Sequence, residues 1–160
     1  MEPLLIMSCS MRKRPGAHRA RDLYDGSAYR VLRLRAPHNL PLLILSAEHG
    51  LISSDEVIEF YDRKMDASRA QELSGGGRIR DARRLVGQLG SFDHVFCYGG
   101  ILYRQVIEAY AEAGVFNAAK VEYSFGRIGE QLAQLKNFLT QGTPSSMPPV
   151  ARIGFWRGRK

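Results

Sequence analysis

The chain has 160 residues, of which 44% are hydrophobic and 9% aromatic, and this composition is typical of a globular protein rather than a disordered or fibrous one. No apolar run approaches the roughly 20 residues that span a bilayer, and Met1-Glu2-Pro3 lacks the basic start of a secretory signal, so we expect a cytoplasmic protein without membrane contact. The net charge of +7 favours a polyanionic partner, DNA or RNA.

The first part of the chain predicts two buried strands and one helix. Residues 3–8 and 40–45 are short apolar runs that end in polar or small residues, as buried strands do. Between them, residues 27–36 have the apolar spacing of a short helix. We expect residues 17–24 to be irregular and residues 54–63 to form a loop or a short helix.

The second part continues this alternation. In chain order we expect a flexible glycine joint over 75–77, a helix over 79–89, a strand over 92–98, a helix over 103–113 ended by Gly114, a strand over 120–123 and a helix over 128–139. Alternating strands and helices predict an α/β fold, a three-layer sandwich with a largely parallel central sheet. We expect residues 1–140 to form one catalytic or nucleic-acid-binding domain, and residues 141–160 to form a Pro/Ser linker and a basic, aromatic tail.

Three of the predicted strands end in small or polar residues, at Ser8–Ser10, Ser46–Gly50 and Gly99–Gly100. The carboxyl ends of parallel strands lie along one edge of a sheet, where α/β proteins bind their ligands. Short side chains and backbone amides can reach a ligand there, and the neighbouring Arg12 and Lys13 can bind its phosphates. The pattern therefore predicts a nucleotide or anion site.

Three residues are candidates for catalysis, each with a structural alternative. Asp62, next to Tyr61, could activate water or stabilise an oxocarbenium-like sugar, or it could simply form a turn. Asp22 could bind the edge of a base, or it could pair with Arg21 or cap the following segment. His49 follows a predicted strand, where catalytic residues are common, although a single histidine is often structural.

The remaining candidates would bind the substrate. Tyr24, Tyr29 or Tyr61 could stack on a base extruded from a nucleic acid. Cys9 could be a nucleophile, but we favour a thiol that points into the core. Neither Cys9 nor Cys97 lies in a metal-ligand spacing, so we expect reduced cysteines and neither a metal nor another cofactor.

Several of these residues belong to longer motifs. They are Ser8-Cys9-Ser10, Lys13, Ala20-Arg21-Asp22-Leu23-Tyr24, Gly26-Ser27, Tyr29, Leu45-Ser46-Ala47-Glu48-His49-Gly50-Leu51 and Tyr61-Asp62. On these motifs the sequence resembles a bacterial and phage family of uncharacterised small proteins, whose pattern includes SCS-K-x-K, ARDLY-x-GS, LSA-x-HGL and PYD. Two positions depart from it: Met11 stands where the family has Lys, and Phe60 where it has Pro.

More distantly, the segment from Ile44 to Leu51 and Tyr61 resemble the YaaA-like peroxide-stress proteins, the core domain of archaeosine synthase and the uracil-DNA-glycosylase-like group. These resemblances imply a uracil-DNA-glycosylase-like fold and a protein that handles a nucleobase in nucleic acid. Our leading interpretation is a metal-independent DNA glycosylase, or a related enzyme of modified bases, with phage defence as one setting. The alternatives are a non-enzymatic DNA-binding stress protein and a hydrolase or transferase of free nucleotides.

This interpretation assigns a role to fourteen residues. The catalytic residues are Asp62, Asp22 and His49, and the substrate-binding residues are Ser8, Ser10, Arg12, Lys13, Tyr24, Ser27, Tyr29, Ser46, Tyr61, Gly99 and Gly100.

Overall fold

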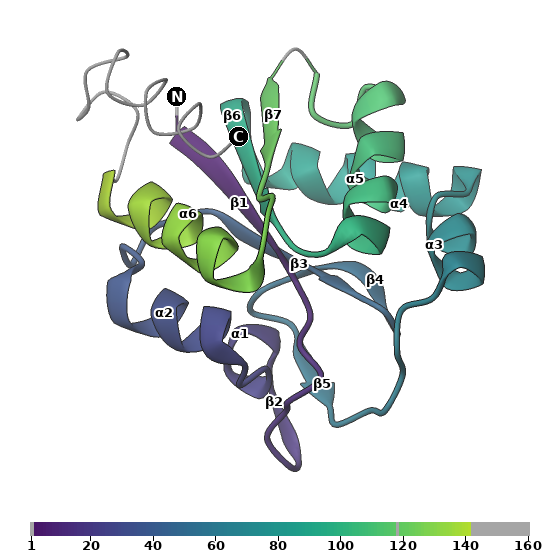
Figure 1. Ribbon diagram of the computed structural model, residues 1–160. Coiled ribbons are helices and arrows are strands. Elements are labelled where there is room, and N and C mark those ends of the chain that lie inside the picture. Colours follow the sequence, from purple (N-terminus) through teal and green to yellow (C-terminus); the bar gives the residue numbers. More distant parts are fainter. Residues whose placement is uncertain (1, 118, 142–160) are drawn as a thin grey trace.

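The computed structural model describes residues 2–117 and 119–141, which form an α/β fold around a mixed, mostly parallel sheet (Figure 1). The sheet order is β4-β3-β1-β6-β7. Its strands are β1 (Glu2–Ser8), β3 (Leu42–Ser46), β4 (Gly50–Ser53), β6 (Phe92–Tyr98) and β7 (Lys120–Tyr123). All neighbouring pairs are parallel except β3 and β4, which are antiparallel.

Helices cover both faces of this sheet (Figure 1). One face packs against α1 (Ala20–Leu23), α2 (Ser27–Arg35) and α6 (Ile128–Gln141), and the other against α3 (Ala67–Leu73), α4 (Gly76–Leu89) and α5 (Ile101–Glu112). The side chains of β1 alternate between the two cores: Leu4 and Ile6 belong to one, Leu5 and Met7 to the other. Since β1 is buried on both faces, its sequence is a continuous apolar run. The sheet with a layer of helices on each face confirms the predicted three-layer arrangement.

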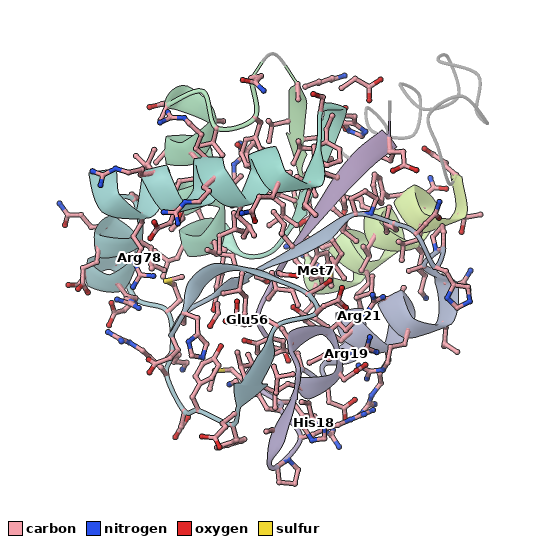
Figure 2. All side chains as sticks on the ribbon, turned by 180° about the vertical axis from the view of Figure 1, so that it is seen from behind. Met7, His18, Arg19, Arg21, Glu56 and Arg78 are labelled. Atoms are coloured by element: carbon pink, nitrogen blue, oxygen red, sulfur yellow. The ribbon has the colours of Figure 1, made fainter. Side chains whose placement is uncertain are left out.

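A second, two-stranded antiparallel sheet lies outside this arrangement and was not predicted. It pairs β2 (Ala17–Arg19) with β5 (Val57–Glu59). Figure 2 labels Met7 near the middle of the molecule and His18, on β2, at its lower end. The prediction of irregular structure over 17–24 was therefore wrong, since this segment contains β2 and α1, and so was that of a loop or short helix over 54–63, which contains β5. Each of these strands has three residues and only Ile58 is buried, so no alternating pattern marks them in the sequence.

Most other elements have the predicted position. The strands over 92–98 and 120–123 have the expected bounds, and Gly114 follows α5 with a φ of 81°, as a residue just past a helix end does. The prediction of a flexible joint over 75–77 was wrong, because Gly75 is the N-cap of α4, which begins at Gly76. The predicted tail lies outside the described residues from position 142 on, and no described helix is long and apolar enough to cross a bilayer.

Candidate functional site

The carboxyl ends of β1, β3 and β6 meet, as predicted. The backbone N–H of Cys9, just past β1, donates to the carbonyl of Leu45 in β3 at 3.0 Å. On the other side, a Cβ atom at Gly99 would lie 2.8 Å from the Cβ of Ser8, a distance that side chains do not tolerate. Glycine at position 99 therefore allows β6 to approach β1 this closely.

Three hydroxyl groups form a hydrogen-bonded chain at this edge. The phenol oxygen of Tyr61 lies 2.7 Å from that of Tyr24 and 2.8 Å from Oγ of Ser46. Ser46 is fully buried, and its Oγ also accepts the backbone N–H groups of Glu48 at 3.1 Å and His49 at 3.0 Å. One serine thus joins the turn after β3 to two tyrosines from other parts of the chain.

Two arginines hold the same turn from the other side. Arg69, in α3, donates from Nε to the carbonyl of Ala47 and from Nη2 to that of Glu48, both at 2.7 Å. Arg78, in α4 and labelled in Figure 2, donates to the carbonyl of His49 at 3.0 Å. All three carbonyl groups of the turn therefore accept a bond from a side chain far along the chain. The sequence analysis missed both arginines, because nothing local distinguishes them from the other arginines of these helices.

The Cys9 thiol lies where the two cores meet and is half-buried. Its Sγ accepts the backbone N–H of Ala47 at 3.4 Å and lies 3.1 Å from the phenol oxygen of Tyr103, in α5. Cys9 is therefore partly in the core, as we favoured, and partly among the polar groups of the site. The sequence analysis placed Tyr103 at the start of a predicted helix, shortly after Gly99-Gly100, but gave it no role in the site.

Four tyrosines surround Cys9, and each keeps its phenol proton at neutral pH. Burial raises the pKa of Tyr24 to about 12, although the neighbouring hydroxyl groups of Ser46 and Tyr61 oppose the shift. Burial also raises the pKa of Tyr61, Tyr29 and Tyr103 well above the usual value, and the Cys9 thiol adds to the increase. These phenols can therefore act as hydrogen-bond donors.

Lys13 brings a positive charge to this network. Its Nζ lies 4.5 Å from the centre of the Tyr61 ring and 6.0 Å from that of Phe60, both within the range of cation–π contacts. Its backbone pairs with that of Tyr24 in an isolated bridge, which fixes the loop after β1 against the segment that carries this tyrosine. His49 contacts the edge of the Tyr61 ring, with the ring centres 5.4 Å apart.

A single carboxylate, Asp25, organises the neighbouring cations. Four arginines lie within 4 Å of it: Arg33 at 2.6 Å, Arg30 at 3.6 Å, and Arg12 and Arg14 at 3.9 Å. Partial burial alone would raise the pKa of Asp25, but the hydrogen bond from Arg30 and the charges of Arg30, Arg33 and Arg14 outweigh it and lower the pKa. Four positive charges around one negative charge leave a basic surface beside the site.

The three predicted catalytic residues have different surroundings. Asp22 pairs with Arg19 at 2.9 Å, and not with Arg21 as the structural alternative had it. Asp62 is exposed, and within the described residues it has no hydrogen bond or ion pair. The ring of His49 contacts Tyr61, as described above. The structure therefore brings His49 to the hydroxyl chain. Asp62 directly follows Tyr61, a member of that chain, whereas Asp22 forms an ion pair with Arg19.

The remaining predicted residues also divide into groups. Tyr29 is buried and donates to the carbonyl of Ser8 at 2.8 Å, and Ser10 donates to the carbonyl of Arg12 at 2.6 Å. Gly100 is the N-cap of α5, and Ser27 is the exposed first residue of α2. Among the described residues, no group of three or more His, Cys, Asp or Glu side chains could hold a metal ion.

Comparison with known proteins adds the following. A family model described as "Family of unknown function (DUF6884)" matches residues 4–137. No curated protein matches the chain. A solved structure titled "Crystal structure of AF0587, a protein of unknown function" aligns over 86% of this chain with 21% identity and a TM-score of 0.45. The chain spans only 44% of that protein's length.

Proposed function

Because the chain belongs to DUF6884, a family of unknown function, we propose its function from the site itself: an enzyme that binds a nucleobase of DNA at the ends of β1, β3 and β6 and cleaves its N-glycosidic bond. In this reaction the bond between C1′ and the base nitrogen breaks, a water oxygen bonds to C1′, and the base leaves with a proton. The resemblance to the uracil-DNA-glycosylase-like group favours this class of reaction.

The observation that supports the proposal most is the combination of aromatic rings and protonated hydroxyls around Tyr61. Its phenol bonds to Tyr24 and Ser46, Lys13 lies over its ring, and His49 lies at its edge. Enzymes that act on an extruded base hold it with aromatic or apolar side chains and read it through hydrogen bonds. This site offers both kinds of contact, together with a positive charge.

Asp62 is the carboxylate that we assign to the reaction. Glu48 pairs with Arg63 at 3.2 Å and Asp22 pairs with Arg19, whereas Asp62 has no such partner within the described part of the chain. It follows Tyr61 directly, so it is close in sequence to the centre of the site. An unpaired carboxylate can activate water or stabilise positive charge on the sugar.

The basic surface around Asp25 would bind the DNA backbone. Arg12, Arg14 and Arg30 are 71%, 44% and 52% exposed, so their guanidinium groups remain accessible although they lie near the carboxylate. Contacts of this kind release counterions, and the affinity for DNA should therefore fall steeply with added salt.

The test is to incubate the protein with unmodified and heavily modified phage DNAs and to search for released bases by mass spectrometry. We expect base release from at least one of them, and loss of release with retained DNA binding in Asp62→Asn. The matched control is Asp93→Asn, an exposed aspartate in β6. Absence of release from every DNA contradicts the proposal.

A second function is favoured by one observation. No described side chain orients Asp62, as expected if the protein binds DNA without catalysis. In that case neither the wild type nor Asp62→Asn releases a base. Both bind DNA equally, and this binding weakens as salt is added. A shallow salt dependence would instead point to a free nucleotide as the ligand.

A further inference from the structure

A count of protons in the hydroxyl chain identifies which donor of the site can bind a ligand. Oγ of Ser46 has two lone pairs, and the N–H groups of Glu48 and His49 occupy both. It cannot accept a third bond from Tyr24 or Tyr61. The hydrogen bond between Ser46 and Tyr61 is therefore donated by the serine.

The two phenols then carry two protons but share one bond between them. Tyr24 is fully buried, and an unpaired proton there would lose its hydration without compensation. The lower-energy arrangement has Tyr24 donating to Tyr61. The phenol oxygen of Tyr61 accepts from both neighbours, and its own proton has no acceptor among the described residues.

The neighbouring pair at Cys9 has the same imbalance. The thiol and the phenol of Tyr103 have two protons and one hydrogen bond between them, and the second hydrogen bond at Sγ is accepted from the backbone N–H of Ala47. One proton of this pair also lacks an acceptor within residues 2–117 and 119–141. The edge of the sheet thus has more donors than acceptors on both sides of Cys9.

We infer that the site binds its ligand through a keto oxygen, which accepts the free proton of Tyr61, so that bases with a keto group are preferred to bases with an amino group at the same ring position. Guanine and thymine present a keto oxygen where adenine and cytosine present an amino group, which is a donor. An amino group facing the Tyr61 proton would leave two donors without an acceptor, and this lowers the affinity more than the absence of a contact does.

A phosphate oxygen is the other source of such an acceptor, but the surroundings favour a base. The donors are neutral phenols beside the rings of Tyr24 and His49, and the one cation at Tyr61, Lys13, lies over the face of its ring, whereas the arginines gather around Asp25. Flat aromatic surroundings suit a base, and guanidinium groups suit a phosphate. This inference rests on the proposed binding of nucleic acid, but it does not require base release.

The experiment compares the binding of single-stranded oligonucleotides that carry one variable base: hypoxanthine against adenine, and uracil against cytosine. Each pair exchanges a keto for an amino group at one ring position. We expect about 3- to 10-fold tighter binding of the keto member, the effect of one hydrogen bond. Tyr61→Phe, which keeps the ring and the contact with Lys13, should abolish this preference by weakening only the keto members.

Tyr110→Phe is the matched control, because the buried Tyr110 donates to the carbonyl of Leu73 and takes no part in the hydroxyl chain, so loss of its hydroxyl should leave the preference intact. An oligonucleotide with an abasic position identifies the source of the acceptor: if Tyr61→Phe weakens its binding equally, the acceptor is a phosphate and the inference is wrong. If the oligonucleotides bind without a keto preference, the inference is wrong, but the proposed binding of DNA is not affected. If no oligonucleotide binds, the proposed function fails with it.

Discussion

Nε of Arg69 donates to the carbonyl oxygen of Ala47 at 2.7 Å, joining α3 to the turn that follows β3. The same guanidinium reaches the carbonyl of Glu48, and the arginine is only 8% exposed. The nearest carboxylate, Glu72, is 3.9 Å away and 60% exposed, so backbone carbonyls rather than a close ion pair compensate the buried charge. The conformation of the turn therefore depends on a residue outside it.

Replacing Arg69 with Met should destabilise the fold by about 1–3 kcal/mol, because two carbonyl groups lose their donor inside the protein. The measurement is the free energy of unfolding in urea. Arg84→Met is the matched control: Arg84 is 66% exposed and pairs with Asp81 on the same helix, so its loss should cost at most about 0.5 kcal/mol. Equal effects of the two substitutions would contradict the role given to Arg69.

Ser46→Ala should be among the more harmful small substitutions in the chain. It removes an acceptor of two backbone N–H groups and the donor to Tyr61, all in a fully buried position, and we expect a loss of about 1–3 kcal/mol. Ser68→Ala, at an exposed position of α3, should change the unfolding free energy by less than about 0.5 kcal/mol. If the two variants have the same stability in urea, Ser46 does not hold the turn.

Gly99→Ala should lower the stability of the fold, whereas Gly87→Ala should raise it. The added methyl group at position 99 meets the Cβ and Oγ of Ser8 at 2.8 and 2.9 Å, and we expect it to cost about 1–3 kcal/mol through displacement of β1 or β6. At position 87, in α4, nothing lies within 4 Å, and alanine should stabilise the helix by about 0.5–1 kcal/mol. Thermal unfolding of both variants tests the prediction, which fails if Gly99→Ala unfolds at the temperature of the wild type.

Asp25→Asn should change how stability depends on pH. The pKa of Asp25 is lower in the folded state than in the unfolded state, so its contribution is present above about pH 4 and disappears as the pH falls through the folded-state pKa. The variant should therefore be less stable than the wild type at pH 7, and the difference should shrink in acid. Unfolding curves from pH 2 to pH 7 measure this, with Asp93→Asn as the exposed control. A constant difference between Asp25→Asn and the wild type at all pH values would rule out the arginine cluster as its cause.

Elements whose ends coincide with a change in the apolar pattern could be predicted from the sequence. β6 and β7 have the expected bounds because their ends coincide with changes of polarity and with glycines, and α2 and α6 follow from apolar spacing. β4 could not be predicted, because it pairs antiparallel with β3 across a turn that looks like the end of a strand. β2 and β5 could not be predicted because each needs the other to form.

Some contacts of the site could be predicted from the sequence and others could not. The sequence indicated that Ser8, Ser46 and Gly99 would meet, because position along parallel strands determines position in space. It gave no sign that Arg69 and Arg78 hold the turn after β3, or that Asp25 gathers four arginines. Those contacts depend on how α2, α3 and α4 pack on the sheet, and packing is not visible in local spacing.

The central position of β1 also has a consequence for biosynthesis. Leu5 pairs with Leu42 on one side and with Phe96 on the other, so β1 is translated before both of its neighbours and receives the second one only after β6 has been translated. Between the translation of β3 and that of β6, β1 has one open edge, and closing the long intervening segment costs entropy before the strand pairing compensates it. The carboxyl end of β1 thus gains its close approach to Gly99 only after β6 has been translated.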